Sequence, residues 1–235
     1  MEDYKKFLNR IYSFEKSEFQ LSKEDFKPNP SLLKKVNLQN RFSNFYGDTI
    51  VFDLDKNTKD FLFECTDRLC KEASECFCER LIPDTFHMTL HDLSNSPQLS
   101  DIAEEVFCNE INLITKLRNE SFLHKNISME STCVFNMVNT SLVMGLKPVN
   151  ENEYNKLIKL YSLVDCIKVL PYPLTPHITL TYYNRNGFSA QSAKKLETVV
   201  NELNKNKLTI ELDINKLFYQ KFSSMNNYIN VFKLF

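Results

Sequence analysis

Hydrophobic and polar positions change their period several times along the chain, and each change marks an expected element. Alternation with β-branched and aromatic residues predicts strands, whereas hydrophobic residues three and four positions apart predict amphipathic helices. From position 49 onward the pattern predicts, in order, a strand, a helix, a strand, a helix and a hairpin of two strands, over residues 49–54, 58–80, 86–93, 101–119, 127–138 and 141–149. Asn139 and Thr140 provide the turn between the last two strands.

The succession of helix, strand, helix and hairpin then occurs a second time. It predicts a helix, a strand, a helix and a second hairpin over residues 151–166, 177–183, 189–205, 208–222 and 227–234. The first copy covers about 58–149 and the second about 151–235. Such a repeat predicts a duplicated unit in a pseudo-two-fold arrangement, with matching elements facing each other across a central cleft.

The N-terminal segment lies outside this repeat. Residues 2–20 have the pattern of an amphipathic helix, and Pro28 and Pro30 then indicate a turn or linker. We therefore expect a helical extension over 1–45, laid against a main domain over 46–235. The main domain is expected to have lobes of about 46–149 and 150–235, and exchange of strands between the lobes is left open.

Composition limits the classes of function. The net charge of −1 supplies no global basic field, so any nucleic-acid role must depend on a local site, suited to a nucleotide or a short piece of RNA. None of the seven cysteines forms a Cys-x-x-Cys pair, and reduced thiols are expected. The four between residues 65 and 78 fall in the predicted helix, where they would scatter around its surface. The N-terminus lacks the pattern of a signal peptide and no apolar run could span a bilayer, so a cytoplasmic monomer without a membrane partner is expected.

Two of the four histidines begin the same short motif. Residues 87–90 are HMTL and residues 177–180 are HITL, and each motif occupies the predicted strand of its copy. Side chains alternate between the faces of a strand, so His87 shares a face with Thr89 and His177 shares a face with Thr179. The hydrophobic residues between them can anchor each strand in the core. The pseudo-two-fold arrangement then brings two imidazoles and two hydroxyls to one cleft.

This set of groups suits cleavage of a phosphodiester. Displacement at phosphorus requires a base on the incoming oxygen and an acid on the departing oxygen, and imidazole titrates near neutral pH. Hydroxyl donors can bind the non-bridging oxygens on which negative charge accumulates. We therefore expect catalysis by His87, Thr89, His177 and Thr179, without a metal or other cofactor.

The two HxTx motifs, half a chain apart in a duplicated α+β unit, resemble those of the 2H phosphoesterase superfamily. That group includes 2′-5′ RNA ligase-like proteins, cyclic nucleotide phosphodiesterases and enzymes that trim RNA ends. The resemblance covers about residues 47–235 in element order and rests in detail on HMTL and HITL. It implies an α+β fold with two antiparallel sheets around a central cleft and helices outside. It also implies that the histidines are acid and base, that the threonines bind phosphate, and that the substrate carries a ribose 2′-linked phosphodiester.

Four further residues are candidates for substrate binding. His91 and Thr181 lie four positions after the motif histidines, so they continue onto the same strand face, where they could contact substrate or lie at the edge of the cleft. Tyr183, two positions further, could stack on a base or simply be an aromatic of the strand. Arg185 follows the strand and could reach phosphate or simply be solvated. His124 falls in a polar loop, and no role is assigned to it.

Two other functions remain open at this stage. The cleft could bind a nucleotide or an RNA end without turnover. Alternatively, His87, His91 and His177 could bind a metal in a hydrolase, although Asp92 is predicted to face away from them. The direction of the reaction, hydrolysis or ligation, and the assignment of acid and base to the two histidines are also open.

Overall fold

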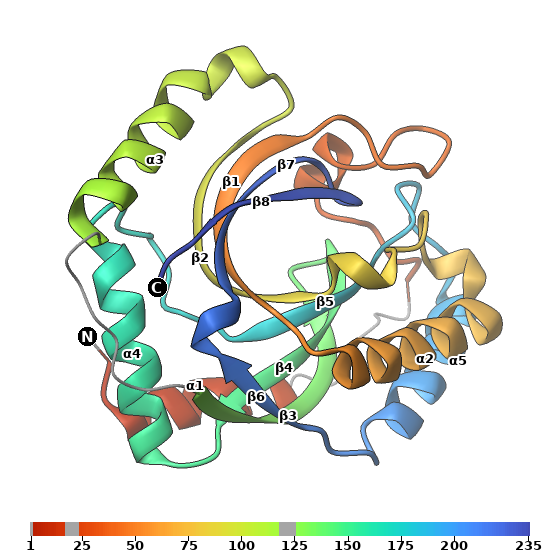
Figure 1. Cartoon of the computed structure of the whole chain (residues 1–235). Helices are drawn as coiled ribbons and strands as arrows, with labels where there is room; N and C mark the ends of the chain where they lie inside the picture. Colours follow the sequence, from red (N-terminus) through yellow and green to blue (C-terminus); the bar gives the residue numbers. More distant parts are fainter. Residues whose placement is uncertain (1, 17–23, 118–125) are drawn as a thin grey trace.

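The computed structural model describes residues 2–16, 24–117 and 126–235 (Figure 1). Its helices are α1 (Tyr4–Lys16), α2 (Lys56–Glu72), α3 (Ala103–Leu117), α4 (Glu151–Asp165) and α5 (Ala190–Leu203). Its strands are β1 (Tyr46–Asp53), β2 (His87–Ser96), β3 (Asn126–Met137), β4 (Ser141–Pro148), β5 (His177–Tyr182), β6 (Thr209–Asp213), β7 (Leu217–Ser224) and β8 (Asn227–Lys233). The predicted helices at 2–20 and 101–119 extend into residues 17–23 and 118–125, which lie outside the described residues, as does His124.

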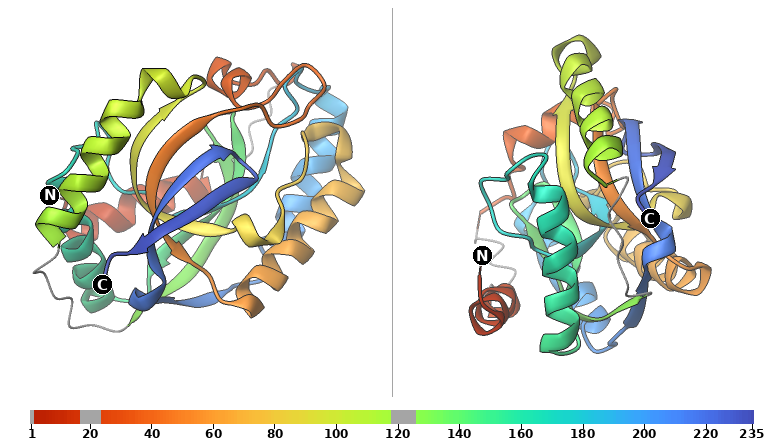
Figure 2. Two further views of the ribbon diagram at one scale, coloured as in Figure 1. Left: turned by 45° about the horizontal axis from the view of Figure 1, so that its top comes forward. Right: turned by 60° about the vertical axis from the view of Figure 1, so that its left-hand side comes forward.

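The described strands form one curved antiparallel sheet in the order β6-β3-β4-β5-β2-β1-β7-β8. Helices α2 and α5 lie side by side at one end of the sheet, and α3 and α4 lie at the other (Figures 1 and 2). The two four-stranded halves join between β2 and β5 through the single pair Met88–Ile178. The predicted α+β class, with two halves about a cleft and helices outside, is confirmed, and the two sheets are continuous at this junction.

The connections follow a pseudo-two-fold pattern. The succession β1-α2-β2-α3-β3 is matched by β4-α4-β5-α5-β7, apart from β6, which lies between α5 and β7 in the chain. Strands β2 and β5 are at the centre of the sheet. Strand β3 pairs with β4, and β7 pairs with β1, so each half of the sheet contains strands from both parts of the chain. This connectivity places the two HxTx strands next to each other.

The predicted strand over 208–222 is wrong in one respect. It is divided by a short 3-10 turn at Ile214–Lys216, and the Asp213 carboxylate accepts a hydrogen bond from the Asn215 amide at the start of that turn. As a result, β6 pairs with β3 in one half of the sheet, whereas β7 pairs with β1 in the other. The hairpin of β7 and β8 forms as predicted.

The helix predicted over 58–80 is too long. Helix α2 ends at Glu72, since the backbone of Ala73 leaves the helical region, and Phe77 then forms an extended bridge with Tyr183. Cys76 and Cys78 are therefore buried outside the helix. Every cysteine of the chain lies in the described ranges, and none forms a disulfide.

The N-terminal extension has two parts that pack differently. Phe7 and Ile11 of α1 contact Tyr154 of α4 in a small separate cluster. Residues 24–45 instead enter the main core, where Leu32 and Val36 are fully buried. None of the helices in the described ranges is both long enough and apolar enough to cross a membrane.

Candidate active site

The two HxTx motifs meet where β2 pairs with β5. Met88 and Ile178 form this pair, and both side chains are fully buried. Because the strands are antiparallel, the residue before Met88 is matched with the residue after Ile178. His87 therefore comes opposite Thr179, and the two line one pocket. By the same register Thr89 comes opposite His177.

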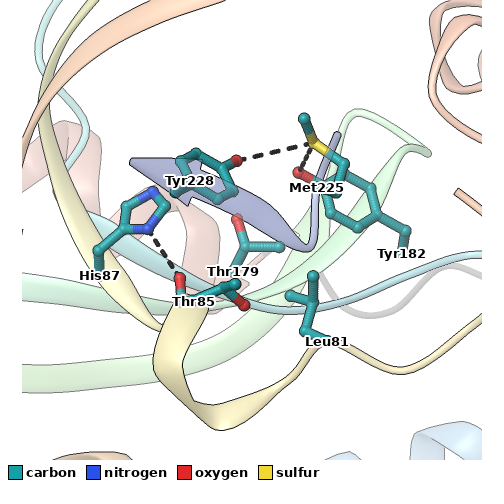
Figure 3. Close-up of a pocket in the computed structure, with 7 residues that line it drawn as sticks. All are labelled: Leu81, Thr85, His87, Thr179, Tyr182, Met225 and Tyr228. Carbon is teal, nitrogen blue, oxygen red and sulfur yellow. Dashed lines mark hydrogen bonds between the residues drawn. The ribbon is translucent and has the colours of Figure 1, made fainter. Parts of the chain in front are cut away.

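The pocket at His87 is covered by the turn of the β7–β8 hairpin (Figure 3). The Tyr228 ring packs edge-on against His87, with 5.0 Å between the ring centroids. The Tyr182 hydroxyl donates to the sulfur of Met225 at 3.1 Å. The lining is completed by Leu81 and Thr85, from the loop before β2. The pocket thus contains one histidine, two threonine hydroxyls and two tyrosines.

Both motif histidines are held in the same way. The Nδ1 atom of His87 lies 2.7 Å from the carbonyl oxygen of Thr85, and Nδ1 of His177 lies 2.7 Å from that of Thr175. A carbonyl oxygen only accepts, so each Nδ1 carries the hydrogen and each Nε2 is left to exchange a proton. Within the described ranges, neither Nε2 atom nor the hydroxyls of Thr89 and Thr179 have a hydrogen-bond partner. These four groups are therefore free to bind a ligand.

Burial keeps both histidines neutral. Desolvation lowers the pKa of His87 to about 4, against the opposing effects of the Thr85 carbonyl and the Asp92 carboxylate. Desolvation also lowers the pKa of His177, again opposed by the backbone carbonyl and by Asp92, while the charge of Lys35 adds to the lowering. In the free protein at neutral pH, both rings are therefore proton acceptors.

A β-bulge follows the motif in β2. The register against β1 shifts between Thr89 and His91, so Leu90 is the extra residue. The bulge turns His91 away from the cleft: its side chain is fully buried, packs on the Tyr161 ring of α4 and lies 3.6 Å from Asp165. The predicted position of His91 on the face of His87 is wrong, because an uninterrupted alternation was assumed.

The same bulge turns Asp92 toward the cleft, opposite to the prediction. Asp92 is exposed, accepts a hydrogen bond from the Tyr172 hydroxyl at 3.2 Å and raises the pKa of both motif histidines. Its contribution to the site was missed, since nothing in the alternation of β2 signals the extra residue.

Strand β5 contains the matching irregularity. Its register against β4 shifts between Thr179 and Thr181, so Thr181 is buried and Tyr182 takes the cleft face instead. The predicted cleft position of Thr181 is therefore also wrong. Tyr182 in β5 corresponds to Asp92 in β2, and because the strands are antiparallel, the two residues lie on opposite sides of the point where β2 pairs with β5.

Tyr183 and Arg185 also lie away from the motif residues. Tyr183 is fully buried in an aromatic cluster with Phe26, Phe77 and Phe188. Arg185 donates through Nη1 to the carbonyl oxygens of Leu33 and Val36. The structure therefore places both residues where the N-terminal extension meets the main domain.

The three histidines considered as metal ligands do not converge. His91 points beneath α4, away from the cleft that contains His87 and His177. Over residues 2–16, 24–117 and 126–235, no group of three or more His, Cys, Asp or Glu side chains is arranged to hold a metal ion.

The two HxTx strands pair at the centre of the described α+β sheet, as the resemblance to the 2H phosphoesterases implies. No family model and no curated protein matches the sequence. Solved structures do: ATU0111 from Agrobacterium tumefaciens, a conserved protein of unknown function, is 14% identical with a TM-score of 0.61, over 89% of this chain and 94% of that one. Escherichia coli LigT complexed with 3′-AMP is 11% identical with a TM-score of 0.50, over 80% of this chain and 96% of that one. At these identities the similarity establishes the fold.

Proposed function

We propose that this chain is a metal-independent phosphodiesterase that acts on a ribose 2′-linked phosphodiester by general acid–base catalysis with two histidines. The substrate would be a 2′,3′-cyclic phosphate, a 2′-5′ link or an RNA end. The observation that carries the proposal is the antiparallel pairing of β2 and β5, which sets His87 opposite Thr179 and Thr89 opposite His177. The ribose class follows from the family resemblance, and the 3′-AMP bound by LigT is consistent with a nucleotide.

The proton transfers follow from the environment of the two rings. In hydrolysis of a cyclic phosphate, one Nε2 takes a proton from water as its oxygen bonds to phosphorus. The other ring, protonated at Nε2, gives its proton to the ribose oxygen that departs from phosphorus. Both rings are neutral in the free protein, so the acid must gain its proton in the complex. The anionic phosphodiester favours this, because a nearby negative charge raises the pKa of an imidazole.

The two threonines are placed to bind the phosphate itself. Thr89 and Thr179 are half-buried on the cleft face of their strands. A hydroxyl can donate one hydrogen bond to a non-bridging oxygen, where charge accumulates in the transition state. The matching positions of the two residues suit the two non-bridging oxygens of one phosphodiester.

The direct test is turnover on a small panel of substrates: 2′,3′-cyclic nucleotides, 2′-5′ and 3′-5′ dinucleotides, and RNA with a cyclic phosphate end. The parent protein is assayed with excess EDTA, and a His87→Ala/His177→Ala double variant controls for contaminating nucleases. We expect cleavage of a 2′-linked substrate by the parent alone, and unchanged cleavage under chelation. Nucleotide binding without turnover would instead support a binding module. Activity lost with EDTA and restored by zinc or manganese would contradict the metal-independent mechanism.

A further inference from the structure

We propose that Lys35, carried by the N-terminal extension, is the cation that binds the substrate's phosphate oxygens in this cleft, and that Arg185 positions it. This inference rests on the proposed function and deepens it, because it assigns charge recognition to a segment outside the repeated unit. It also makes the extension a part of the active site.

Lys35 reaches the cleft over two aromatic rings. Its Nζ atom lies 5.3 Å from the centroid of the Tyr182 ring and 5.2 Å from that of Phe45. Tyr182 lines the pocket together with His87 and Thr179. Aromatic faces attract a cation and let the aliphatic stem pack while the ammonium group stays accessible. The half-buried Lys35 is thus held against a residue that lines the pocket.

The charge of Lys35 has no counter-charge in the described part of the chain. Lys59, the other lysine that affects a motif histidine, forms an ion pair with Asp53 at 2.6 Å. Lys35 forms no such pair with a described carboxylate, and its charge reaches His177, whose pKa it helps to lower. A phosphodiester anion bound between the motif residues would supply the missing negative charge. Lysine binds phosphate as a compact point charge, which suits this role.

Arg185 fixes the backbone on both sides of Lys35. Its Nη1 donates to the carbonyl oxygens of Leu33 and Val36, and its backbone amide donates to the side chain of Asn40 at 2.8 Å. The Lys35 carbonyl in turn accepts from the Ser43 amide at 2.9 Å, which closes the loop between them. Arg185 was a candidate for binding phosphate directly, and these contacts indicate that it acts on phosphate through Lys35.

The test compares two adjacent lysines. Lys35→Met keeps the aliphatic stem and removes the charge, and Lys34→Met is the matched control, because Lys34 is exposed. Binding of inorganic phosphate, 3′-AMP and adenosine is measured by calorimetry. Since a hydrogen bond to a charged group contributes about 1.5–3 kcal/mol, we expect Lys35→Met to weaken phosphate and 3′-AMP binding about 10- to 100-fold. Adenosine binding and the control should change less than about twofold. Unchanged 3′-AMP affinity in Lys35→Met would overturn the inference.

The role of Arg185 is tested by a measurement that separates positioning of Lys35 from a purely structural role. We expect Arg185→Met to weaken 3′-AMP binding, and to have no further effect in the Lys35→Met background, because both changes remove one interaction. A partial return of affinity in Arg185→Lys would support positioning through the two carbonyl groups. Additive losses in the double variant would contradict it.

A second measurement tests the position of Lys35 without any ligand. The imidazole signals of His177 are titrated by NMR in the parent and in both lysine variants. Removing the charge of Lys35 should raise the pKa of His177. The Asp92 carboxylate on β2 also raises this pKa, whereas burial lowers it. The Lys34→Met variant should titrate as the parent does. If the pKa of His177 is the same in Lys35→Met as in the parent, Lys35 lies outside the site.

The two proposals fail in different ways. A parent that binds 3′-AMP through Lys35 but cleaves no substrate would contradict the enzymatic function and leave the role of Lys35 standing. A parent that cleaves a cyclic phosphate with the same KM in Lys35→Met would leave the function standing and contradict the role of Lys35.

Discussion

At the scale of single residues, the site consists of four side chains in two matching pairs. Each histidine is fixed through Nδ1 by the carbonyl oxygen two residues before it, which leaves Nε2 to exchange a proton. The proposed mechanism requires one proton donor and one proton acceptor in the same transition state. On this proposal, neither histidine can replace the other.

The first prediction concerns the four motif residues. His87→Ala and His177→Ala should each reduce cleavage of a 2′,3′-cyclic nucleotide or 2′-5′ dinucleotide about 10²–10⁴-fold, the usual contribution of a positioned acid or base. The double variant should be little slower than either single variant, since both rings act in one step. Thr89→Val and Thr179→Val should cost less, roughly 10–10³-fold. Steady-state kinetics measure these losses, with circular dichroism as the folding control, and near-parental turnover in either His→Ala variant would exclude the mechanism.

The second prediction concerns pH. Burial lowers the pKa of both rings, to about 4 for His87. The mechanism needs one protonated and one neutral ring, and the free protein reaches that state only at a pH below the ordinary histidine pKa. The value of kcat/KM reports the free enzyme and should rise as pH falls below neutral. Bound phosphodiester raises the pKa of one ring, so the optimum of kcat should lie at higher pH than that of kcat/KM. Coincident optima near pH 7 would contradict this account of the two rings.

At the scale of elements, the paired bulges decide which residues after the motifs reach the cleft. In β2 the extra residue turns His91 under α4 and brings Asp92 to the site. In β5 it turns Thr181 into the core and brings Tyr182 to the pocket. The repetition of the bulge at the same place in both copies preserves the pseudo-symmetry of the cleft.

The third prediction concerns His91 and Asp92, whose roles are the reverse of those that a regular alternation along β2 would give them. His91→Ala leaves a cavity beneath α4 and should lower the free energy of unfolding by about 1–3 kcal/mol, with kcat within about threefold of the parent. Asp92→Asn should leave unfolding almost unchanged and shift the kcat/KM optimum further to acid pH, because Asp92 raises the pKa of both motif histidines. Urea unfolding and pH profiles measure the two effects. The opposite result would mean that β2 continues without a bulge.

At the scale of the whole molecule, the N-terminal extension is bound to the loop between β5 and α5. Phe26 and Phe188 exchange backbone hydrogen bonds, and their rings stack with 4.4 Å between centroids. Gly187 sits at this junction with a φ of +76°, and a Cβ atom there would lie 2.1 Å from the Phe26 carbonyl oxygen. Only glycine permits both the backbone conformation and the close approach.

The fourth prediction tests this junction. Gly187→Ala should lower the free energy of unfolding by about 1–3 kcal/mol, since it adds backbone strain and displaces Phe26. The exposed neighbour Asn186→Ala is the control and should change stability by less than about 0.5 kcal/mol. Denaturant unfolding measures both variants. Equal stability of the two would show that the extension does not depend on this contact.

The sequence by itself determined the elements and the four motif residues. Hydrophobic period predicted the helices and most strands, because the period depends on local geometry. The alternation of His and Thr predicted that each pair lies on one strand face, because alternation within a few residues is also local. The similar position of the two motifs in their copies was sufficient to predict that they meet.

Only the tertiary structure decided which other residues lie beside the four motif residues. Each bulge shows itself only in the register against a neighbouring strand, so the exchange of His91 for Asp92 and of Thr181 for Tyr182 could not be predicted from β2 or β5 alone. The division of residues 208–222 into β6 and β7 depends on two partners in different halves of the sheet. Lys35 reaches the cleft through contacts of its loop with Arg185, 150 positions further along the chain. Contacts between residues so distant in sequence arise only when the chain folds, and they leave no period in the sequence.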